Sequence, residues 1–210
     1  MHLQGCGDVL PNFSLEIPKI PEPIPVKLEA KASALILVDL QNDFLHPNGA
    51  LYMGDGARRI INPVKILLDK ASSRGVPVIY TQDWHPPDSP EFDIWPKHAV
   101  MDTWGSEIIE ELKPVFVSFT VRKEVYDAFY GTGLDALLSL LRVKHLVVAG
   151  VVSNICVLHT VGSSALRGYK PYIPVDCIAA LNDFDQLLTL RQISFLYKGV
   201  LTRSDLLDFY

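Results

Sequence analysis

"ALILVD", residues 34–39, is an unbroken run of apolar residues that ends in an acid, and it points to the fold of the whole chain. A short apolar run without alternating polar residues is typical of a strand that is buried on both faces of a sheet. Runs of the same kind recur along the chain, at residues 76–82, 115–119, 145–150, 170–176 and 199–202. Together these segments predict a six-stranded, mostly parallel sheet.

Helical periodicity fills the segments between the predicted strands. Residues 62–74 repeat apolar positions at helical spacing, with Asn62 as the expected cap and Pro63 in the first turn. The same spacing predicts helices over residues 105–112, 132–142, 153–167 and 184–197. Alternating strands and helices are typical of a parallel sheet with helices on both faces. We therefore expect a Rossmann-like α/β fold, in which a single domain has three layers, α/β/α.

The first thirty-one residues differ in composition from the rest of the chain. Residues 11–31 contain five prolines and show neither helical nor strand periodicity, which predicts an extended arm. We assign residues 1–31 to this proline-rich arm and residues 32–210 to the folded domain. Such an arm is also suited to contact a neighbouring subunit.

Composition and charge exclude several classes of partner. The apolar runs are too short to span a bilayer, so no membrane association is expected. The chain has 19 Lys and Arg against 24 Asp and Glu, a net charge of −5 and no basic cluster, which argues against a nucleic-acid partner. The amino-terminal segment lacks the pattern of a secretory signal, and three widely spaced cysteines argue against a disulfide framework. We expect a cytoplasmic protein with a small-molecule ligand.

Reactive side chains follow the ends of the first four predicted strands. Asp39 ends the first strand, Asp83 and His85 follow the second, Lys123 follows the third, and Cys156 follows the fourth. Because ligands of open α/β sheets bind outside the carboxyl ends of the strands, these side chains are expected to meet at one edge of the sheet.

Three of these residues form a candidate catalytic group. A carboxylate at the end of an apolar strand has little water around it, so the pKa of Asp39 is expected to rise and to suit a base. Cys156 lies at a strand–helix junction, where a helix amino end is expected to lower the pKa of the thiol and to bind an oxyanion. Lys123 would favour the thiolate. Each residue also has a plain structural interpretation: Asp39 as a turn cap, Lys123 as a solvated surface residue and Cys156 as a core cysteine. For Cys177 we expect the core interpretation.

The loop after the second strand is a candidate metal site. Asp83 and His85 lie on the same side of an extended segment, and His98 follows thirteen residues after His85. Two imidazoles and a carboxylate suit Zn²⁺, with ligand distances of about 2.0–2.2 Å, and Fe²⁺ or Mn²⁺ accepts similar ligands. The Asp-x-His pattern is common by chance, but the prolines of the loop restrict its freedom and favour a fixed ligand set. They are Pro86, Pro87, Pro90 and Pro96.

Four motifs, in the same order along the chain, resemble the nicotinamidases within the isochorismatase-like cysteine hydrolases. The resemblance spans roughly residues 34 to 203. The motifs are ALILVDLQNDFLHPNGAL (34–51), TQDWHP with WPKHAV (81–86 and 95–100), VRK (121–123) and GVVSNICVLHT (150–160). They resemble the family's first strand and turn, its metal loop, its lysine segment and its nucleophile turn.

The resemblance implies a role for each of these side chains. By position it implies Asp39 as general base, Lys123 as electrostatic partner and Cys156 as nucleophile, and it implies Asp83, His85 and His98 as metal ligands. It further implies that Phe44 and Trp95 stack a substrate ring, that the N–H groups of Val152 and Cys156 form the oxyanion hole, and that the Val151–Val152 peptide is cis. Tyr126 is expected to contact the substrate.

The chain also departs from the family pattern. Ala99 replaces a cysteine that often follows the second histidine, Glu124 replaces a glycine after Lys123, and the pair Ser153-Asn154 replaces a threonine and an acid. For a fourth metal ligand we expect Glu91, with Asp88 or a water molecule as alternatives.

The activity that the resemblance implies is metal-dependent hydrolysis of nicotinamide to nicotinate and ammonia through a thioester on the cysteine. Another amidase or carbamoyl hydrolase of the same superfamily stays open, as does an isochorismatase, although the Asp-x-His…His loop argues against the last. A non-catalytic ligand-binding protein of the same fold is the alternative from a different class. The resemblance also implies a homo-oligomer, a dimer or a tetramer.

Overall fold

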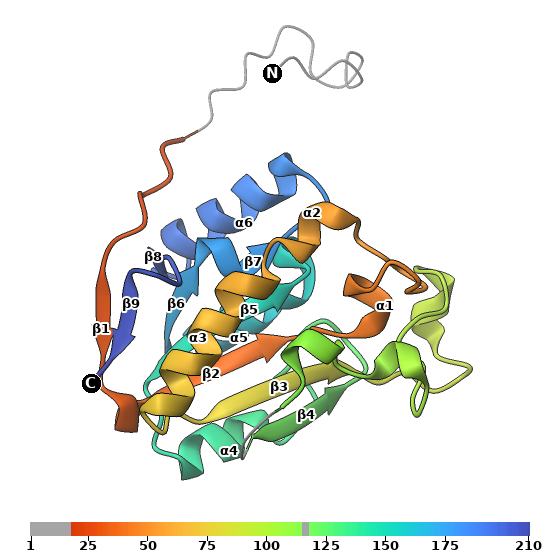
Figure 1. Cartoon of the computed structure of the whole chain (residues 1–210), viewed down its shortest axis with the longest axis horizontal. Helices are drawn as coiled ribbons and strands as arrows, with labels where there is room; N and C mark the ends of the chain where they lie inside the picture. The colour runs from red at the N-terminus through yellow and green to blue at the C-terminus, as the bar shows by residue number, and fades with distance from the viewer. Residues whose placement is uncertain (1–17, 115–117) are drawn as a thin grey trace, which may run out of the picture.

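A parallel sheet lies at the centre of the computed structural model, which describes residues 18–114 and 118–210 (Figure 1). Within these ranges the strand order is β4-β3-β2-β5-β6-β8, the short β7 pairs with β5, and all neighbours run parallel. The strands are β2 (Ser33–Val38), β3 (Val78–Asp83), β4 (Phe119–Lys123), β5 (His145–Val151), β6 (Lys170–Pro174), β7 (Ile178–Ala179) and β8 (Val200–Thr202). The predicted fold class is confirmed. The seventh strand, β7, has two residues and is too short to form an apolar run.

The unbroken apolar runs arise because both faces of the sheet are buried. In β2, Leu35 and Leu37 pack into one core cluster, and Ala34, Ile36 and Val38 pack into the other. All five side chains are fully buried. A strand whose alternate residues enter two separate cores has no polar face, so alternation is absent from its sequence.

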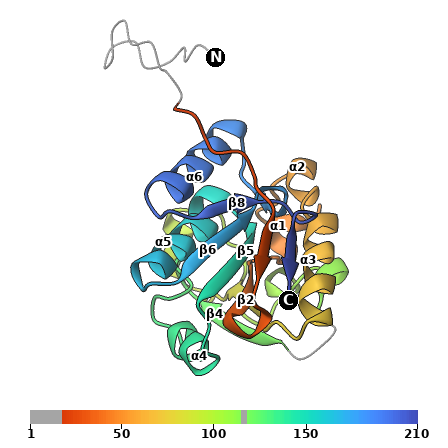
Figure 2. The same ribbon diagram turned by 90° about the vertical axis from the view of Figure 1, so that its left-hand side faces the viewer.

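Helices cover the two faces of the sheet and complete the three layers. Helix α3 (Ile61–Ser73) packs on one face, and α4 (Leu134–Leu140), α5 (Leu158–Leu166) and α6 (Asp183–Phe195) pack on the other, as Figure 2 shows. Two further helices of one turn each, α1 (Asn42–Leu45) and α2 (Asp55–Arg58), lie between β2 and α3 in the chain.

Several predicted elements differ from the observed ones. The helix predicted over 105–112 is wrong, because two short 3₁₀ turns, Trp104–Ser106 and Glu110–Leu112, occupy this region. The strand predicted at 115–119 lies mainly outside the described residues, and β4 begins at Phe119 and pairs with β3 up to Lys123. Asn62 is not the cap of α3, since that helix begins at Ile61 with Ile60 before it.

A second, two-stranded parallel sheet joins the two ends of the described chain. Strand β1 (Val26–Leu28) pairs with β9 (Leu207–Phe209), and Val26 lies opposite Leu207. The Ile24 N–H donates to the Leu201 carbonyl at 3.0 Å. The final part of the predicted arm therefore binds the carboxyl-terminal residues of its own chain. No helix among the described residues is long and apolar enough to cross a bilayer.

The order of the strands places a crevice between β2 and β5. From β2 the chain adds β3 and then β4 on one side, and it returns to the other side of β2 with β5. At such a switch point the connections leave the sheet in opposite directions, and ligands bind outside the carboxyl ends of the two strands. A functional site is therefore expected above the ends of β2 and β5.

We predict that Gly150→Ala destabilises the fold far more than Gly168→Ala. Gly150 pairs with Val38, and a Cβ atom there would lie 2.1 Å from the Val38 carbonyl oxygen, whereas nothing lies within 4 Å of a Cβ at Gly168. Both glycines have positive φ, so both changes have the backbone cost of about 1–2 kcal/mol. For Gly150→Ala, the steric overlap with Val38 lowers the free energy of unfolding by about a further 1–3 kcal/mol. Urea unfolding measures both losses, and equal losses would contradict the close approach of β2 and β5.

Candidate active site

Four side chains that were singled out in the sequence meet at the carboxyl edge of the sheet. Asp39 directly follows β2, Asp83 ends β3, Lys123 ends β4, and Cys156 lies in the turn after β5. All four are buried, with between 1% and 5% of their surface exposed. The structure thus brings together residues that are separated by up to 117 positions, from 39 to 156.

The Lys123 ammonium lies between the other three groups. Its Nζ atom is 2.8 Å from Asp39 Oδ2, bonds to Asp83 Oδ1, and donates to Cys156 Sγ at 3.5 Å. One oxygen of each carboxylate and the sulfur all lie within 4.8 Å of one another. A cation shared by two acids and a thiol is a compact, buried arrangement in which charge interactions are strong.

Burial and charge act on these groups in opposite directions. Burial raises the pKa of Asp39 despite the nearby Lys123 ammonium. For Asp83 burial also raises the pKa, but Lys123 and His85 outweigh it and lower the pKa below the usual value. Burial lowers the pKa of Lys123, yet the two carboxylates outweigh it and raise the pKa well above its usual value. Lys123 is therefore a permanent cation, and Asp39 is the more basic of the two acids.

The thiol of Cys156 differs from the sequence-based prediction. Burial raises the pKa of Cys156 well above its usual value, although Lys123 acts to lower it, so the predicted lowering is wrong. The reason is the local structure: residues Ser153–Val157 form a single π-helical turn ahead of α5, in which Cys156 is only 5% exposed. The resting thiol is protonated, and a base is needed to activate it.

Thr81 and Gln41 orient the two acids. The Thr81 hydroxyl donates to Asp39 Oδ1 at 2.7 Å. The Gln41 side-chain amide donates to the Asp83 carbonyl at 2.8 Å and accepts from the Asp83 N–H at 2.9 Å. The sequence analysis missed both residues. Their only signal in the sequence was polarity, at Thr81 within β3 and at Gln41 shortly after β2.

Asp83, His85 and His98 form a second cluster beside the first. One ligand atom from each residue lies within 4.8 Å of the others, and all three side chains are buried. His85 Nε2 has no hydrogen-bond partner among the described residues. His98 Nδ1 is 2.7 Å from the Pro96 carbonyl, an acceptor, which assigns the proton to Nδ1 and leaves Nε2 free to bind a cation. This donor set fits a divalent metal ion.

The fold of the loop explains how two histidines thirteen residues apart meet. The His85 N–H donates to the Ala99 carbonyl at 3.1 Å, and the Met101 N–H donates to the His85 carbonyl at 2.9 Å. This parallel bridge, between His85 and Val100, folds the loop back on itself. Trp84 lies between Asp83 and His85 in the sequence, but its side chain stacks with Arg122. The guanidinium carbon of Arg122 is 3.8 Å from the centre of the Trp84 ring.

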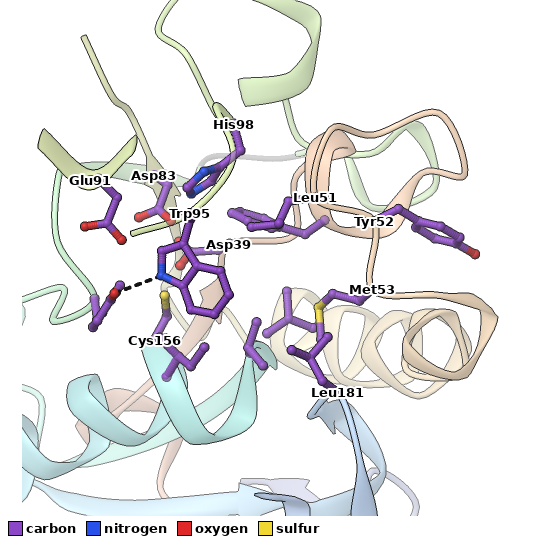
Figure 3. A pocket seen from close by; sticks show the side chains of 15 residues that line it. Asp39, Leu51, Tyr52, Met53, Asp83, Glu91, Trp95, His98, Cys156 and Leu181 are labelled. Atoms are coloured by element: carbon purple, nitrogen blue, oxygen red, sulfur yellow. Dashed lines mark hydrogen bonds between the residues drawn. The ribbon is translucent and has the colours of Figure 1, made fainter. Parts of the chain in front are cut away.

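A cavity of about 100 Å³ opens above the two clusters, a size suited to a small molecule. The acids and His98 gather at one end, and Leu51, Met53 and Leu181 lie at the other (Figure 3). All four predicted substrate-contacting residues line the cavity: Phe44, Trp95, Tyr126 and Val152. Leu51, Met53 and Leu181 were missed, because apolar residues on connecting segments have no distinctive pattern.

Two further details concern the predicted ligands and the nucleophile turn. Glu91 lines the same cavity but is not part of the three-residue cluster, so its role as fourth ligand stays a prediction. The Val151–Val152 peptide is cis, as the resemblance implied. The N–H groups of Ile155 and Val157 donate to the Val152 carbonyl at 3.0 and 3.2 Å, which closes the turn around Cys156.

We predict that the protein binds Zn²⁺ and that His85→Ala weakens this binding by about 100-fold or more, because a cluster of three ligands loses one. His145→Ala is the matched control: His145 also has a ring nitrogen without a hydrogen-bond partner, but it lies at the opposite end of β5. Calorimetric titration of metal-free protein measures both. Equal zinc affinity in wild type and His85→Ala would contradict the assignment.

Comparison with known proteins gives consistent matches. The family model of the isochorismatase domain matches residues 33–205. The ureidoacrylate amidohydrolase RutB of Caulobacter segnis is 29% identical over 215 residues, which cover 90% of this chain and 89% of the relative. The nicotinamidase of Saccharomyces cerevisiae is 26% identical over 197 residues, covering 73% of this chain and 91% of the relative. The crystal structure of N-carbamoylsarcosine amidase from Thermoplasma acidophilum has a TM-score of 0.76 at 32% identity, covering 82% and 96% of the two chains. The chain belongs to the isochorismatase domain family.

Proposed function

We propose that the protein is a cysteine amidohydrolase that converts nicotinamide to nicotinate and ammonia. The observation that carries the proposal is the contact of the Lys123 ammonium with Asp39, Asp83 and Cys156 in one buried cluster beside a small cavity. A nucleophile, a base and a fixed positive charge are the three groups that acyl transfer requires.

The first half of the reaction forms a thioester. Asp39, whose pKa is raised by burial, takes the proton of the Cys156 thiol, and the sulfur attacks the carboxamide carbon. The Lys123 charge beside the sulfur stabilises the thiolate as it forms. When the tetrahedral intermediate collapses, the C–N bond breaks, and Asp39 returns its proton to the leaving nitrogen. Ammonia departs, and the acyl group stays on Cys156.

The second half of the reaction regenerates the thiol. Asp39 is again a carboxylate and takes a proton from a water molecule, which attacks the thioester carbon. The C–S bond breaks, Asp39 returns its proton to the sulfur, and the nicotinic acid that forms loses its own proton to solvent and is released as nicotinate. The same buried base therefore serves both halves, since each begins with a proton that must be removed and ends with one that must be returned.

The metal cluster and the aromatic side chains place the substrate in this scheme. Asp83, His85 and His98 would hold a divalent ion, most simply Zn²⁺, and such an ion supplies Lewis-acid affinity for a ring nitrogen. Phe44 and Trp95 both line the cavity and offer aromatic faces to a planar ring. Trp95 is itself fixed, because its indole N–H donates to the Tyr126 hydroxyl at 3.0 Å.

The charge of the cavity supports a neutral substrate. Its lining includes three acids, Asp39, Asp83 and Glu91, and no lysine or arginine stands among the described lining residues. Lys123 is buried behind the lining, where it already bonds to two acids. Lys123 neutralises part of the charge of Asp39 and Asp83, and an ion on the metal cluster would add positive charge, so Glu91 is the lining acid without a cation of its own. It would repel the carboxylate of ureidoacrylate or of N-carbamoylsarcosine, the compounds after which two of the relatives are named. Nicotinamide carries no carboxylate.

We predict that Cys156→Ala lowers ammonia release from nicotinamide by about a thousandfold or more, because the change removes the sulfur that carries the acyl intermediate. Cys177→Ala is the matched control. Cys177 is a fully buried cysteine packed in the core on the other side of the sheet, so this variant is expected to stay active. An active Cys156→Ala enzyme would disprove the proposed mechanism.

The preference for a neutral amide is tested with a panel of substrates. We predict that kcat/KM for nicotinamide exceeds that for ureidoacrylate and for N-carbamoylsarcosine by at least about a hundredfold, since an unpaired buried charge costs about 3 kcal/mol or more. Ammonia release measured for each compound at equal enzyme concentration gives the ratios. A preference for either anionic compound would favour the ureido-hydrolase alternative and exclude nicotinamide as the main substrate.

A further inference from the structure

Asp43 is a buried acid that takes no part in the reaction described above. It lies on α1, close behind the cavity wall, and its residue surface is 7% exposed. No ion pair within the described ranges involves it. A buried carboxylate without a cation needs several hydrogen-bond donors, so the identity of its donors shows what it does.

The two carboxylate oxygens of Asp43 accept from two different loops. Oδ2 accepts from the Ala99 N–H at 2.7 Å, and Ala99 follows the metal-cluster residue His98. Oδ1 accepts from the Ala50 N–H at 2.9 Å, and Ala50 precedes Leu51, which lines the cavity. One carboxylate thus joins the metal loop to the segment that forms the cavity wall.

The backbone of α1 adds further contacts to the same two segments. The Leu51 N–H donates to the Asp43 carbonyl and the Met53 N–H donates to the Phe44 carbonyl, each at 3.0 Å. The Phe44 ring meets the His98 ring edge-on, with 5.5 Å between the centroids. The cavity wall and the metal loop therefore depend on the same short helix.

The metal loop needs this support at Ala99. Its φ angle is +43°, in the left-handed region that residues with a Cβ atom rarely adopt. Such a conformation persists only where surrounding bonds fix it. Two bonds do so here: Asp43 accepts from the Ala99 N–H, and the Ala99 carbonyl accepts from the His85 N–H at 3.1 Å.

The backbone at Gly105, in a nearby segment of the same chain, leaves room for the Asp43 carboxylate. A Cβ atom at Gly105 would lie 2.1 Å from Asp43 Oδ2 and 2.5 Å from Oδ1. Only glycine fits at this position while the carboxylate keeps its place. A side chain at position 105 would therefore displace the carboxylate from its two donors.

We propose that Asp43 is a positioning residue that sets the metal loop and the cavity wall relative to each other. It touches neither the thiol nor the metal-binding atoms, and it acts through the backbone of Ala99 and Ala50. The predicted effect of Asp43 on zinc affinity depends only on the cluster of Asp83, His85 and His98. Its predicted effect on KM rests on the proposed function.

Asp43→Asn is the sharpest test, because it changes charge and donor pattern with almost no change in shape. Both oxygens of Asp43 accept an N–H, and an asparagine offers only one oxygen. Its NH₂ group must face the N–H of either Ala99 or Ala50, so at least one of the two loops is released.

The experiment measures Zn²⁺ affinity of the metal-free full chain by calorimetry, and KM and kcat for nicotinamide at saturating zinc. For Asp43→Asn we expect zinc affinity to fall, or KM to rise, by tenfold or more. We expect kcat at saturation to stay within threefold of wild type, because the reacting groups are intact. A purely structural role would lower stability without this split between KM, zinc affinity and kcat.

Asp176→Asn is the matched control. Asp176 also has both oxygens occupied, by the Ser204 N–H at 2.9 Å and the Ser204 hydroxyl at 2.6 Å, but it does not line the cavity. We expect this variant to lose stability and to keep wild-type zinc affinity and KM. If Asp43→Asn keeps both values within twofold of wild type, or if Asp176→Asn shows the same changes, the proposal is overturned.

A second variant covers the case in which Asp43→Asn does not fold. Gly105→Ala places a Cβ atom against the Asp43 carboxylate and is expected to weaken zinc binding by tenfold or more, whereas Gly56→Ala, with nothing within 4 Å of its Cβ, leaves zinc binding unchanged. Unchanged zinc affinity in Gly105→Ala counts against the proposal. Because the zinc titration needs no substrate, a wild-type enzyme that fails to hydrolyse nicotinamide refutes the proposed function without deciding the role of Asp43.

Discussion

The placement of the Lys123 ammonium among two buried carboxylates and a thiol is the interaction on which the site depends. These side chains are buried, so each ionised group needs a partner, and Lys123 is the partner that Asp39, Asp83 and Cys156 share. The cation keeps Asp83, a member of the metal cluster, ionised, and it lies next to the sulfur that becomes negative. Four parallel strands that end at one level make this arrangement possible.

Much of this arrangement was predictable from the sequence, because it follows from the strand pattern. Unbroken apolar runs such as residues 34–39 predicted the parallel sheet, and the reactive residues at or after the ends of the first four runs marked the edge where the site lies. The strands that were not predicted are short or pair with segments that are distant in the sequence. β7 has two residues, and β1 pairs with β9, where Val26 lies opposite Leu207, 181 positions later in the chain. The pKa of Cys156 was predicted in the wrong direction, because the extent of its burial is set by the packing of the turn.

The residues that orient the site illustrate the same limit of sequence patterns. Gln41 bonds to the backbone of Asp83, and Asp43 bonds to the backbone of Ala50 and Ala99. Both follow β2 within four positions of Asp39, in a stretch that resembles a turn of no special chemistry. Their partners are backbone groups, up to 65 residues away, which have no residue type to recognise. The reacting groups are thus visible in the sequence, and the groups that position them become visible only in the fold.

The central claim is that Cys156 carries the acyl group of the substrate, and it is tested most directly by trapping that species. The enzyme is mixed with nicotinamide, quenched in acid during turnover and digested, and the peptides are analysed by mass spectrometry. The account predicts a nicotinoyl thioester on the peptide that contains Cys156 and none on Cys177. Steady turnover of nicotinamide with the nicotinoyl group on another residue would contradict it.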